Sequence, residues 1–392
     1  MRVAGIIAEY NPLHTGHVYH LHMARQITGA EYAVVVLSGD FVQRGEPAIV
    51  DKRRRTRMAL AAGADVVLEL PVSWATGSAE RFAAGAVEIL DRLGVVTDLV
   101  CGCECEDEAL LEKAAHLLLE ESESFRNVLK EALRSGLSFP QARAAALEQE
   151  LPGGTGLLSG PNNILAIEYR KALLGRSSQI RFHGLVRSGA GYLQEELPAA
   201  SSYASATALR EAILEGRSPG SPELAAFLPP GSQDALDYCI GPDDLTLLLH
   251  HALHCLPAET ILSIQDMAPE LVRRLDGLRG ELLTFRETAK LLKRCNIAHS
   301  RINRVLLHLV LGLTEPAPRE IPAVRLLGFR KDTPLMRRLQ DISDIPIITK
   351  LTDADPSWFA SDIAASELYR SLVWQKTGIR LESEYRSHPV LF

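Results

Sequence analysis

Residues 3–17 read Val-Ala-Gly-Ile-Ile-Ala-Glu-Tyr-Asn-Pro-Leu-His-Thr-Gly-His. The apolar run over 3–8 predicts a buried strand, and a helix is expected to begin at Thr15 or Gly16. His14 and His17 are three residues apart, so at a helix start both can face one side. The unpaired N–H groups and positive dipole of a helix start favour an anion. Two imidazoles there could donate hydrogen bonds to the phosphates of a nucleotide as its α-phosphorus is attacked.

The pattern His-x-Gly-His is short, and two surface histidines in a loop are the alternative interpretation. Here a strand precedes the pattern, a helix follows it, and it lies near residue 15. In this context it resembles the signature of the nucleotidylyltransferase and class I aminoacyl-tRNA synthetase superfamily. That resemblance implies cleavage of ATP between its α- and β-phosphates, with an adenylated intermediate or product.

Further apolar runs alternate with helical segments along the first part of the chain. Strands are expected at 32–37, 66–70 and 97–101, with helices at 51–62 and 78–93. This alternation predicts an α/β fold with a doubly wound parallel sheet. Ligands of such sheets bind outside the carboxyl ends of the strands. The loops expected to share one cleft are therefore 8–17, 38–52, 71–78 and 102–106.

The length of 392 residues exceeds that of a usual single core and predicts two domains. We expect a nucleotidylyltransferase-like catalytic domain at 1–215, with a helical hairpin inserted at about 106–150. Strands become scarce after it, so 216–392 is expected to be a mostly α-helical C-terminal domain.

Hydrophobic residues make up 46% of the chain and charged residues 23%, as in ordinary globular proteins. The net charge is −7, so any contact with RNA must come from a local basic patch. Six cysteines are too few and too irregularly spaced for a disulfide scaffold. Met1-Arg2 leads straight into the first strand, and no run of 18 apolar residues suggests a membrane span. We expect a cytoplasmic protein.

Two other segments carry groups that could bind phosphate. Five of the six residues in 52–57 are Lys or Arg, and we expect Lys52 or Arg53 to contact phosphate or nucleic acid, although such runs are usually solvated. Ser205, Thr207 and Arg210 open a further helix and could hold a leaving pyrophosphate; a plain helix cap is the alternative.

Two clusters invite a metal interpretation, and we expect a metal at neither. Cys101, Cys103 and Cys105 alternate along a strand, but no second pair with zinc spacing appears. The histidines near Cys255 have i, i+4 spacing on an expected helix, where ordinary packed or surface residues are the simpler interpretation; these are His250, His251 and His254.

The best candidate for an RNA surface lies in residues 281–350. This segment holds 13 Lys or Arg against 7 Asp or Glu in an otherwise acidic protein. Its basic residues on expected helices and turns are Arg286, Lys290, Lys293, Arg294, Arg301 and Arg304. Helices often carry such charge without a nucleic-acid partner, which is the alternative.

Taken together, several segments resemble the bacterial tRNA(Met) cytidine acetate ligase family. They are 5–20, the Ser-Gly-x-Phe-x-Gln-Arg-Gly-Glu-Pro block at 38–47, 68–71, 161–165, 205–207, 301–308 and 327–329. The resemblance runs nearly end to end. It implies that acetate attacks the α-phosphate of ATP to give acetyl-adenylate, and that the acetyl group then passes to N4 of the wobble cytidine of elongator tRNA(Met). Mg²⁺ is expected with the triphosphate.

The resemblance also implies the residues of the ATP site. His14 and His17 would stabilise the transferred phosphate, Asn162 would hold adenine or ribose, and Arg187 the base or phosphates. The whole implied set is Ile7, Ala8, Glu9, Tyr10, Asn11, Pro12, Leu13, His14, Thr15, Gly16, His17, Val18, Tyr19, His20, Gly102, Asn162, Arg187 and Ser188. The chain departs mildly from the family pattern, with Leu13 in place of Phe, Thr15 in place of Asn and Cys103 in place of Ser.

Two other functions fit parts of the sequence. A small-molecule adenylyltransferase of the same superfamily would use the same histidines, but such proteins are commonly about half this length. A non-catalytic RNA-binding protein would need neither His14 nor His17.

Overall fold

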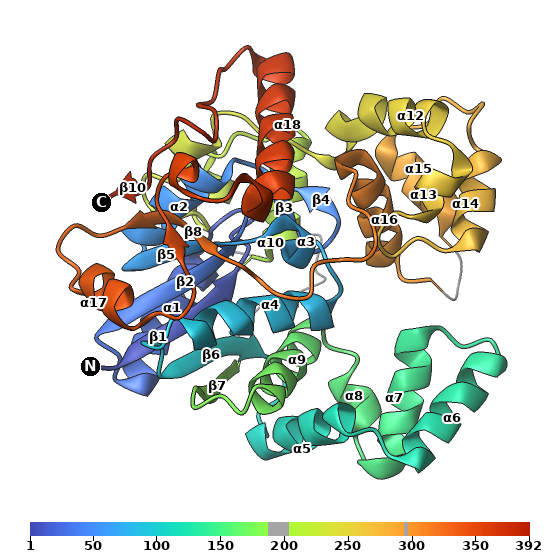
Figure 1. Cartoon of the computed structure of the whole chain (residues 1–392), viewed down its shortest axis with the longest axis horizontal. Helices are drawn as coiled ribbons and strands as arrows, with labels where there is room; N and C mark the ends of the chain where they lie inside the picture. Colours follow the sequence, from blue (N-terminus) through green and yellow to red (C-terminus); the bar gives the residue numbers. More distant parts are fainter. Residues whose placement is uncertain (187–203, 294–296) are drawn as a thin grey trace.

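The computed structural model describes residues 1–186, 204–293 and 297–392. Its core is an eight-stranded sheet in the order β10-β8-β5-β2-β1-β6-β7, with β9 paired to β8 (Figure 1). The strands are β1 (Val3–Ala8), β2 (Tyr32–Ser38), β5 (Val66–Leu70), β6 (Asp98–Cys103), β7 (Arg181–Val186), β8 (Val324–Phe329), β9 (Ile347–Ile348) and β10 (Val390–Leu391). All neighbouring strands are parallel except β5 and β8. The predicted doubly wound sheet is confirmed.

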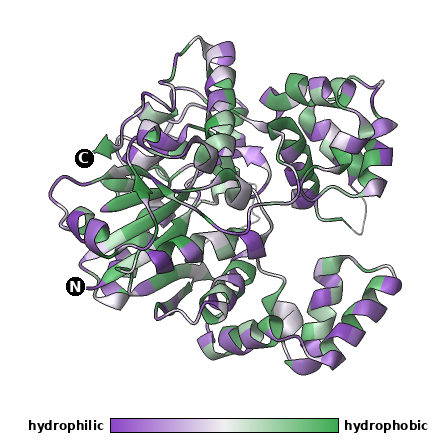
Figure 2. Ribbon diagram, viewed as in Figure 1, coloured by the Kyte–Doolittle hydropathy of each residue, from purple (hydrophilic) through white to green (hydrophobic). Residues whose placement is uncertain are grey.

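Helices cover both faces of this sheet. The long ones near it are α1 (Thr15–Thr28), α2 (Lys52–Ala61), α4 (Ala79–Arg92) and α9 (Pro161–Gly175). Val35 and Leu37 of β2 pack in the core that α1 and α2 share, whereas Val34 and Val36 pack in the core that α4 and α9 share. Because successive strand residues face opposite ways, a strand buried on both faces must be apolar throughout. Figure 2 shows the resulting hydrophobic strands at the centre of the molecule.

The remaining helices form two projections and a few connections. They are α3 (Val72–Ala75), α5 (Glu108–Leu119), α6 (Glu123–Arg134), α7 (Phe139–Glu150), α8 (Gly154–Leu157), α10 (Ala206–Leu214), α11 (Pro222–Ala225), α12 (Thr246–Cys255), α13 (Ala258–Leu262), α14 (Pro269–Asp276), α15 (Phe285–Leu292), α16 (His299–Leu311), α17 (Leu335–Ile342) and α18 (Ala360–Thr377). Figure 1 shows α5–α8 and α12–α16 projecting from the same side of the α/β body. The expected insertion at 106–150 thus holds three helices rather than a hairpin.

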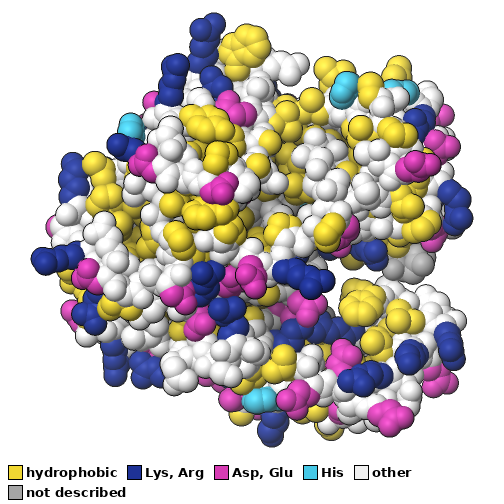
Figure 3. Space-filling view, in the orientation of Figure 1, with side chains coloured by type: hydrophobic (Ala, Val, Ile, Leu, Met, Phe, Trp, Pro, Cys, Tyr) yellow, Lys and Arg dark blue, Asp and Glu magenta, His cyan; other side chains and the backbone are white. Residues whose placement is uncertain are grey.

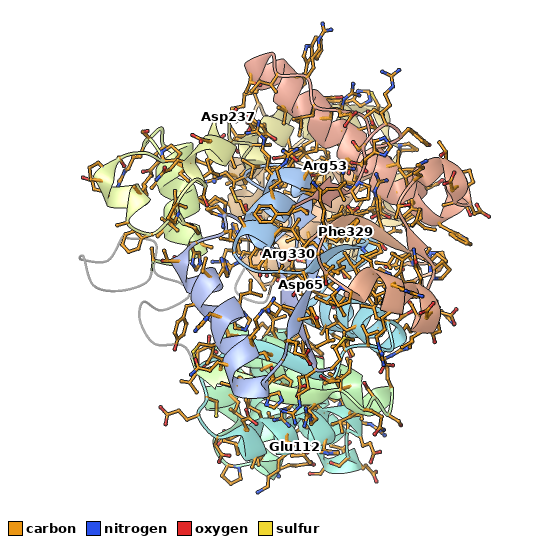
Figure 4. All side chains as sticks on the ribbon, turned by 90° about the vertical axis from the view of Figure 1, so that its left-hand side faces the viewer. Arg53, Asp65, Glu112, Asp237, Phe329 and Arg330 are labelled. Carbon is orange, nitrogen blue, oxygen red and sulfur yellow. The ribbon has the colours of Figure 1, made fainter. Side chains whose placement is uncertain are left out.

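The chain returns to the sheet after α16. Strand β8 pairs antiparallel with β5, and the N–H of Arg330 donates to the carbonyl of Asp65 at 2.9 Å. Figure 4 shows Asp65, Phe329 and Arg330 close together where the two strands meet. Without β8, the edge of β5 would present unpaired backbone groups. The part expected to be a separate helical domain, 216–392, therefore supplies three strands to the N-terminal sheet, which differs from the division predicted at 215/216.

A buried ion network ties α2 to this returning segment. The Nζ of Lys52 lies 2.6 Å from Glu69 Oε1 and 3.3 Å from Glu384 Oε2, and it donates to Ser366 Oγ at 2.9 Å. Burial lowers the pKa of Lys52, but Glu384 and Glu69 outweigh that effect and leave it raised. Arg53 likewise turns to this segment, where it donates to the carbonyl of His388 at 2.7 Å. Lys52 is thus buried among carboxylates, which differs from its expected contact with phosphate or RNA, while Arg53 is turned toward the same segment.

Replacing Lys52 with Met should destabilise the fold by about 3–5 kcal/mol, because Glu69 would stay buried without its partner. Denaturant unfolding monitored by circular dichroism measures the effect. The double variant Lys52→Met/Glu69→Gln should recover part of the loss, since it removes the stranded charge. Lys113→Ala on the exposed face of α5 is the control and should change little. Equal stability of Lys52→Met and Lys113→Ala would contradict the structural role of the network.

Candidate active site

The junction between β1 and α1 is built by a reciprocal pair of hydrogen bonds. His14 is the N-cap of α1, and its Nδ1 accepts the N–H of Gly16 at 3.1 Å. The N–H of His14 in turn donates to Nδ1 of His17 at 3.3 Å. The two rings stack with their centroids 3.7 Å apart. Because both Nδ1 atoms accept, each neutral ring carries its proton on Nε2 and can donate from there.

The loop before this cap is held from several sides. Tyr10 has a φ of 50°, in the left-handed region, and its ring lies edge-on to His17 with centroids 5.1 Å apart. Asn11 Oδ1 accepts the N–H of Ile49 at 2.7 Å, and the Asn11 carbonyl accepts from Arg210 at 3.0 Å. These contacts bring the loop after β1, the segment before α2 and helix α10 to one place.

A cavity of about 190 Å³ opens at this place. The predicted residues that line it are Ile7, Ala8, Glu9, Tyr10, Asn11, His14, Gly16, His17, Tyr19, His20, Gly102, Asn162, Thr207 and Arg210. Residues lining it that were not predicted as site residues include Gln43, Arg44, Phe82, Cys101, Leu165, Tyr169, Leu185, Val186 and Ala206. Gln43 and Arg44 belong to the 38–47 segment that carries part of the family resemblance, but neither was predicted to be a site residue.

Several predicted residues lie outside the lining. Pro12, Leu13, Thr15 and Val18 belong to the same loop and helix but do not line the cavity. Ser205 also lies outside the lining and caps α10 by accepting the N–H of Ala208 at 3.0 Å, whereas Arg210 does line the cavity and is ion-paired with Glu46 at 2.8 Å. Arg187 and Ser188 lie outside the described residues.

Glu104 was missed as a site residue although it lies in the predicted loop after β6. Its Oε1 accepts the N–H and the side-chain amide of Asn162 at 3.2 and 2.5 Å. Its Oε2 accepts the N–H of Asn163 at 2.7 Å, and Asn163 Oδ1 accepts the N–H groups of Glu104 and Cys105. A carboxylate at the start of α9 satisfies unpaired helix N–H groups. It thereby fixes Asn162 at the wall of the cavity.

Two of the arginines expected on an RNA surface, Arg301 and Arg304, differ in exposure, and a third, Arg294, lies outside the described residues. Arg301 is exposed and donates weakly to the carbonyl of Asp266 at 3.4 Å. Arg304 is buried, with its Nε 3.6 Å from Asp266 Oδ2. Its backbone packs directly on Gly45 in the turn between β3 (Phe41–Val42) and β4 (Glu46–Pro47). Arg304 is therefore a packing residue, which corrects its expected place on the surface.

Among the described residues, no group of three or more His, Cys, Asp or Glu is placed to hold a metal ion. Burial raises the pKa of Cys103 to about 11 and raises that of Cys101 well above its ordinary value, so both thiols stay protonated at neutral pH. His251 and Cys255 contact each other at 3.5 Å on the exposed side of α12. Within the same residues, no helix is both long and apolar enough to span a membrane.

Residues 1–384 match the model of the family described as HIGH Nucleotidyl Transferase. A relative from Thermoanaerobacter sp. (strain X514), named tRNA(Met) cytidine acetate ligase, is 37% identical over 395 residues and 97% of each chain. A relative of the same name from Clostridium perfringens (strain ATCC 13124) is 34% identical over the whole of both chains. The chain belongs to the tRNA(Met) cytidine acetate ligase family of HIGH nucleotidyl transferases.

Solved structures extend this family relationship to the fold. The crystal structure of Thermotoga maritima TmcAL in its apo form I superposes with a TM-score of 0.92 at 30% identity and covers all of both chains. A second structure, described as TmcAL bound with alpha-thio ATP, superposes with a TM-score of 0.91 at the same identity. The nucleotidylyltransferase fold predicted from the sequence is thus confirmed.

The contact between Glu104 and Asn162 generates a prediction about nucleotide affinity. Glu104→Ala should weaken binding of α-thio ATP by roughly tenfold, because Asn162 loses the charged acceptor that orients it. Isothermal titration calorimetry measures the change. Glu106→Ala, two residues along the same loop and exposed, is the matched control. Equal affinities of the two variants would contradict the positioning role of Glu104.

Proposed function

We propose that this protein is an ATP-dependent ligase that joins acetate to N4 of the wobble cytidine in elongator tRNA(Met). In the first step acetate attacks the α-phosphate of ATP, giving acetyl-adenylate and diphosphate. In the second step the acetyl group passes to the cytidine. The observation that carries the proposal is the pair His14 and His17, which face a cavity at the first helix of a chain related over its full length to enzymes of this name.

The first step needs charge stabilisation more than a base, because acetate is already an anion at neutral pH. The Nε2–H groups of His14 and His17 and the positive end of α1 would stabilise the charge that develops at the α-phosphate. Asn162 would hold the adenine or ribose. Thr207 at the start of α10 would meet the leaving diphosphate, with Arg210 nearby. Arg187 and Ser188 stay predicted ATP contacts.

Mg²⁺ would accompany the triphosphate. Magnesium is usually bound by one or two carboxylates together with phosphate oxygens and water. The described residues that line the cavity include one carboxylate, that of Glu9. The protein therefore offers few ligands, and phosphate oxygens and water would supply most of the coordination and screen the triphosphate charge.

The tRNA would bind beside this cavity, and we propose Arg301 on α16 as one of its contacts. On the face shown in Figure 3, Lys and Arg side chains are spread among Asp and Glu rather than gathered in one patch. Individual exposed cations near the site would then matter more than a broad basic surface. A tRNA substrate also favours a cytoplasmic place of action.

Mass analysis of nucleosides after incubation of tRNA with the protein, acetate and ATP tests the proposal. N4-acetylcytidine should form only with both small substrates present, and acetate should be required for exchange of labelled diphosphate into ATP. Exchange that needs a phosphorylated cofactor precursor would favour the small-molecule adenylyltransferase. No exchange at all would favour the non-catalytic RNA-binding protein.

Replacing His14 or His17 with Ala should slow acetate-dependent exchange by at least roughly a hundredfold, as loss of other preorganised donors does. The matched control is His22→Ala, since His22 is exposed on the same helix. Near-normal exchange in both active-site variants would overturn the assigned role of the pair.

Arg301→Ala should weaken tRNA binding about threefold and reduce the salt dependence of binding by about one phosphate contact, while ATP affinity stays unchanged. Filter binding at several salt concentrations measures both quantities. Arg338→Ala, an exposed arginine on α17, is the control. A change in ATP affinity without a change in tRNA binding would contradict the assignment of Arg301 to the RNA surface.

A further inference from the structure

One lining residue is not explained by the phosphates of a nucleotide alone. Glu9 is the single acidic side chain among the described residues that line the cavity. A carboxylate beside phosphates is repelled by their charge, which disfavours nucleotide binding. A carboxylate in this place therefore calls for a positive or hydrogen-bond-donating partner in the reaction.

The structure holds Glu9 in one position. It follows β1 directly, and its backbone carbonyl accepts from Arg55 Nη1 at 2.8 Å. Its Oε1 accepts the N–H of Gln43 at 2.8 Å. Within residues 1–186, 204–293 and 297–392, Oε2 takes part in no hydrogen bond. One oxygen thus fixes the side chain, and the other remains for a ligand in the cavity.

The second step of the proposed reaction creates a need for a proton acceptor. N4 of cytidine attacks the acetyl carbonyl carbon, and the nitrogen must lose a proton once the C–N bond has formed. His14 and His17 are poorly suited to take it, since their Nδ1 atoms already accept hydrogen bonds from the helix start and their Nε2 atoms carry protons. The lining residues with a suitable acceptor are then Glu9 and His20.

We propose that Glu9 accepts the proton from N4 of cytidine during acetyl transfer, an inference that rests on the proposed function. The N4 lone pair forms the bond to the acetyl carbon. The bond between the acetyl group and the AMP phosphate oxygen breaks, and its electron pair leaves with AMP. The proton released from N4 passes to Glu9 Oε2. Before that, the same oxygen orients the amine by accepting its N–H.

Burial supports this role of the carboxylate. It raises the pKa of Glu9 above the ordinary value, although the N–H of Gln43 and the cations Arg44 and Arg210 partly oppose the rise. A general base works best when its pKa lies nearer the working pH. Glu9 is thus a stronger base than an exposed glutamate would be.

The test separates the two steps in the full-length protein with the variant Glu9→Gln. Glutamine keeps the size of the side chain and an oxygen for the N–H of Gln43, but it cannot take a proton. Glu9 also lines the nucleotide cavity, so acetate-dependent exchange of diphosphate into ATP is measured on the same variant as an internal reference and should fall much less than transfer does. Transfer from preformed acetyl-adenylate to tRNA(Met) should fall roughly a hundredfold or more, the usual contribution of a general base.

Two further measurements distinguish a general base from a residue that only supports the structure. In the unaltered protein the transfer rate should rise with pH until Glu9 is ionised and then level off, and Glu9→Gln should lose that inflection. Glu9→Asp should recover part of the transfer rate, because it restores a carboxylate. Thermal melting of each variant reports whether it is folded.

Several outcomes would overturn the inference. Normal transfer by Glu9→Gln would do so, and so would a selective loss of transfer in His20→Gln in its place. A loss of exchange in Glu9→Gln that extra Mg²⁺ restores would make Glu9 a metal ligand instead. Absence of acetate-dependent exchange in the unaltered protein is a different result, because it would overturn the proposed function itself.

Discussion

The reciprocal cap of His14 and His17 is the interaction on which the site depends. A helix start leaves N–H groups without partners, and here two imidazole nitrogens supply acceptors. This use of Nδ1 fixes the proton of each ring on Nε2, so the bonds that begin α1 also determine what the histidines can do chemically. A change in the local backbone would alter the chemistry even if both side chains were kept. Fold and reactivity are set here by the same few atoms.

The cap in turn depends on buried polar groups that hold the loop before it. Arg55 is fully buried and donates to the carbonyls of Glu9, Ser38 and Val50, and also to that of Gly39. The carbonyls of Glu9, Ser38 and Gly39 lie at the ends of β1 and β2, and that of Val50 lies just before α2. Without Arg55 they would be buried without donors, which costs free energy for each group. The guanidinium suits this task because its donors form a planar fork.

The sequence predicted the parts of this arrangement that are encoded locally. Buried parallel strands are apolar throughout, and helix starts carry recognisable caps, so β1, β2 and α1 could be read directly. The pairing of β8 with β5 joins segments more than 250 residues apart, and no local pattern carries that information. The same limit explains why the burial of Lys52 and Arg304 could not be predicted. A charged side chain on a helix is expected to be exposed to solvent. Only the tertiary structure shows that Lys52 pairs with Glu384 and Arg304 with Asp266.

The α16 projection and the cavity are joined through one small turn. Gly45 has a φ of 79°, and its Cα packs so closely on the backbone of Arg304 that a side chain could not fit between them. Gln43 and Arg44 precede it, line the cavity, and place the N–H that holds Glu9. A displacement of α16 must therefore move this turn or break its packing, since close-packed interiors transmit strain rather than absorb it. An RNA bound against α16 would therefore press on the turn whose Gln43 N–H holds the Glu9 carboxylate, which is the group proposed above as the proton acceptor.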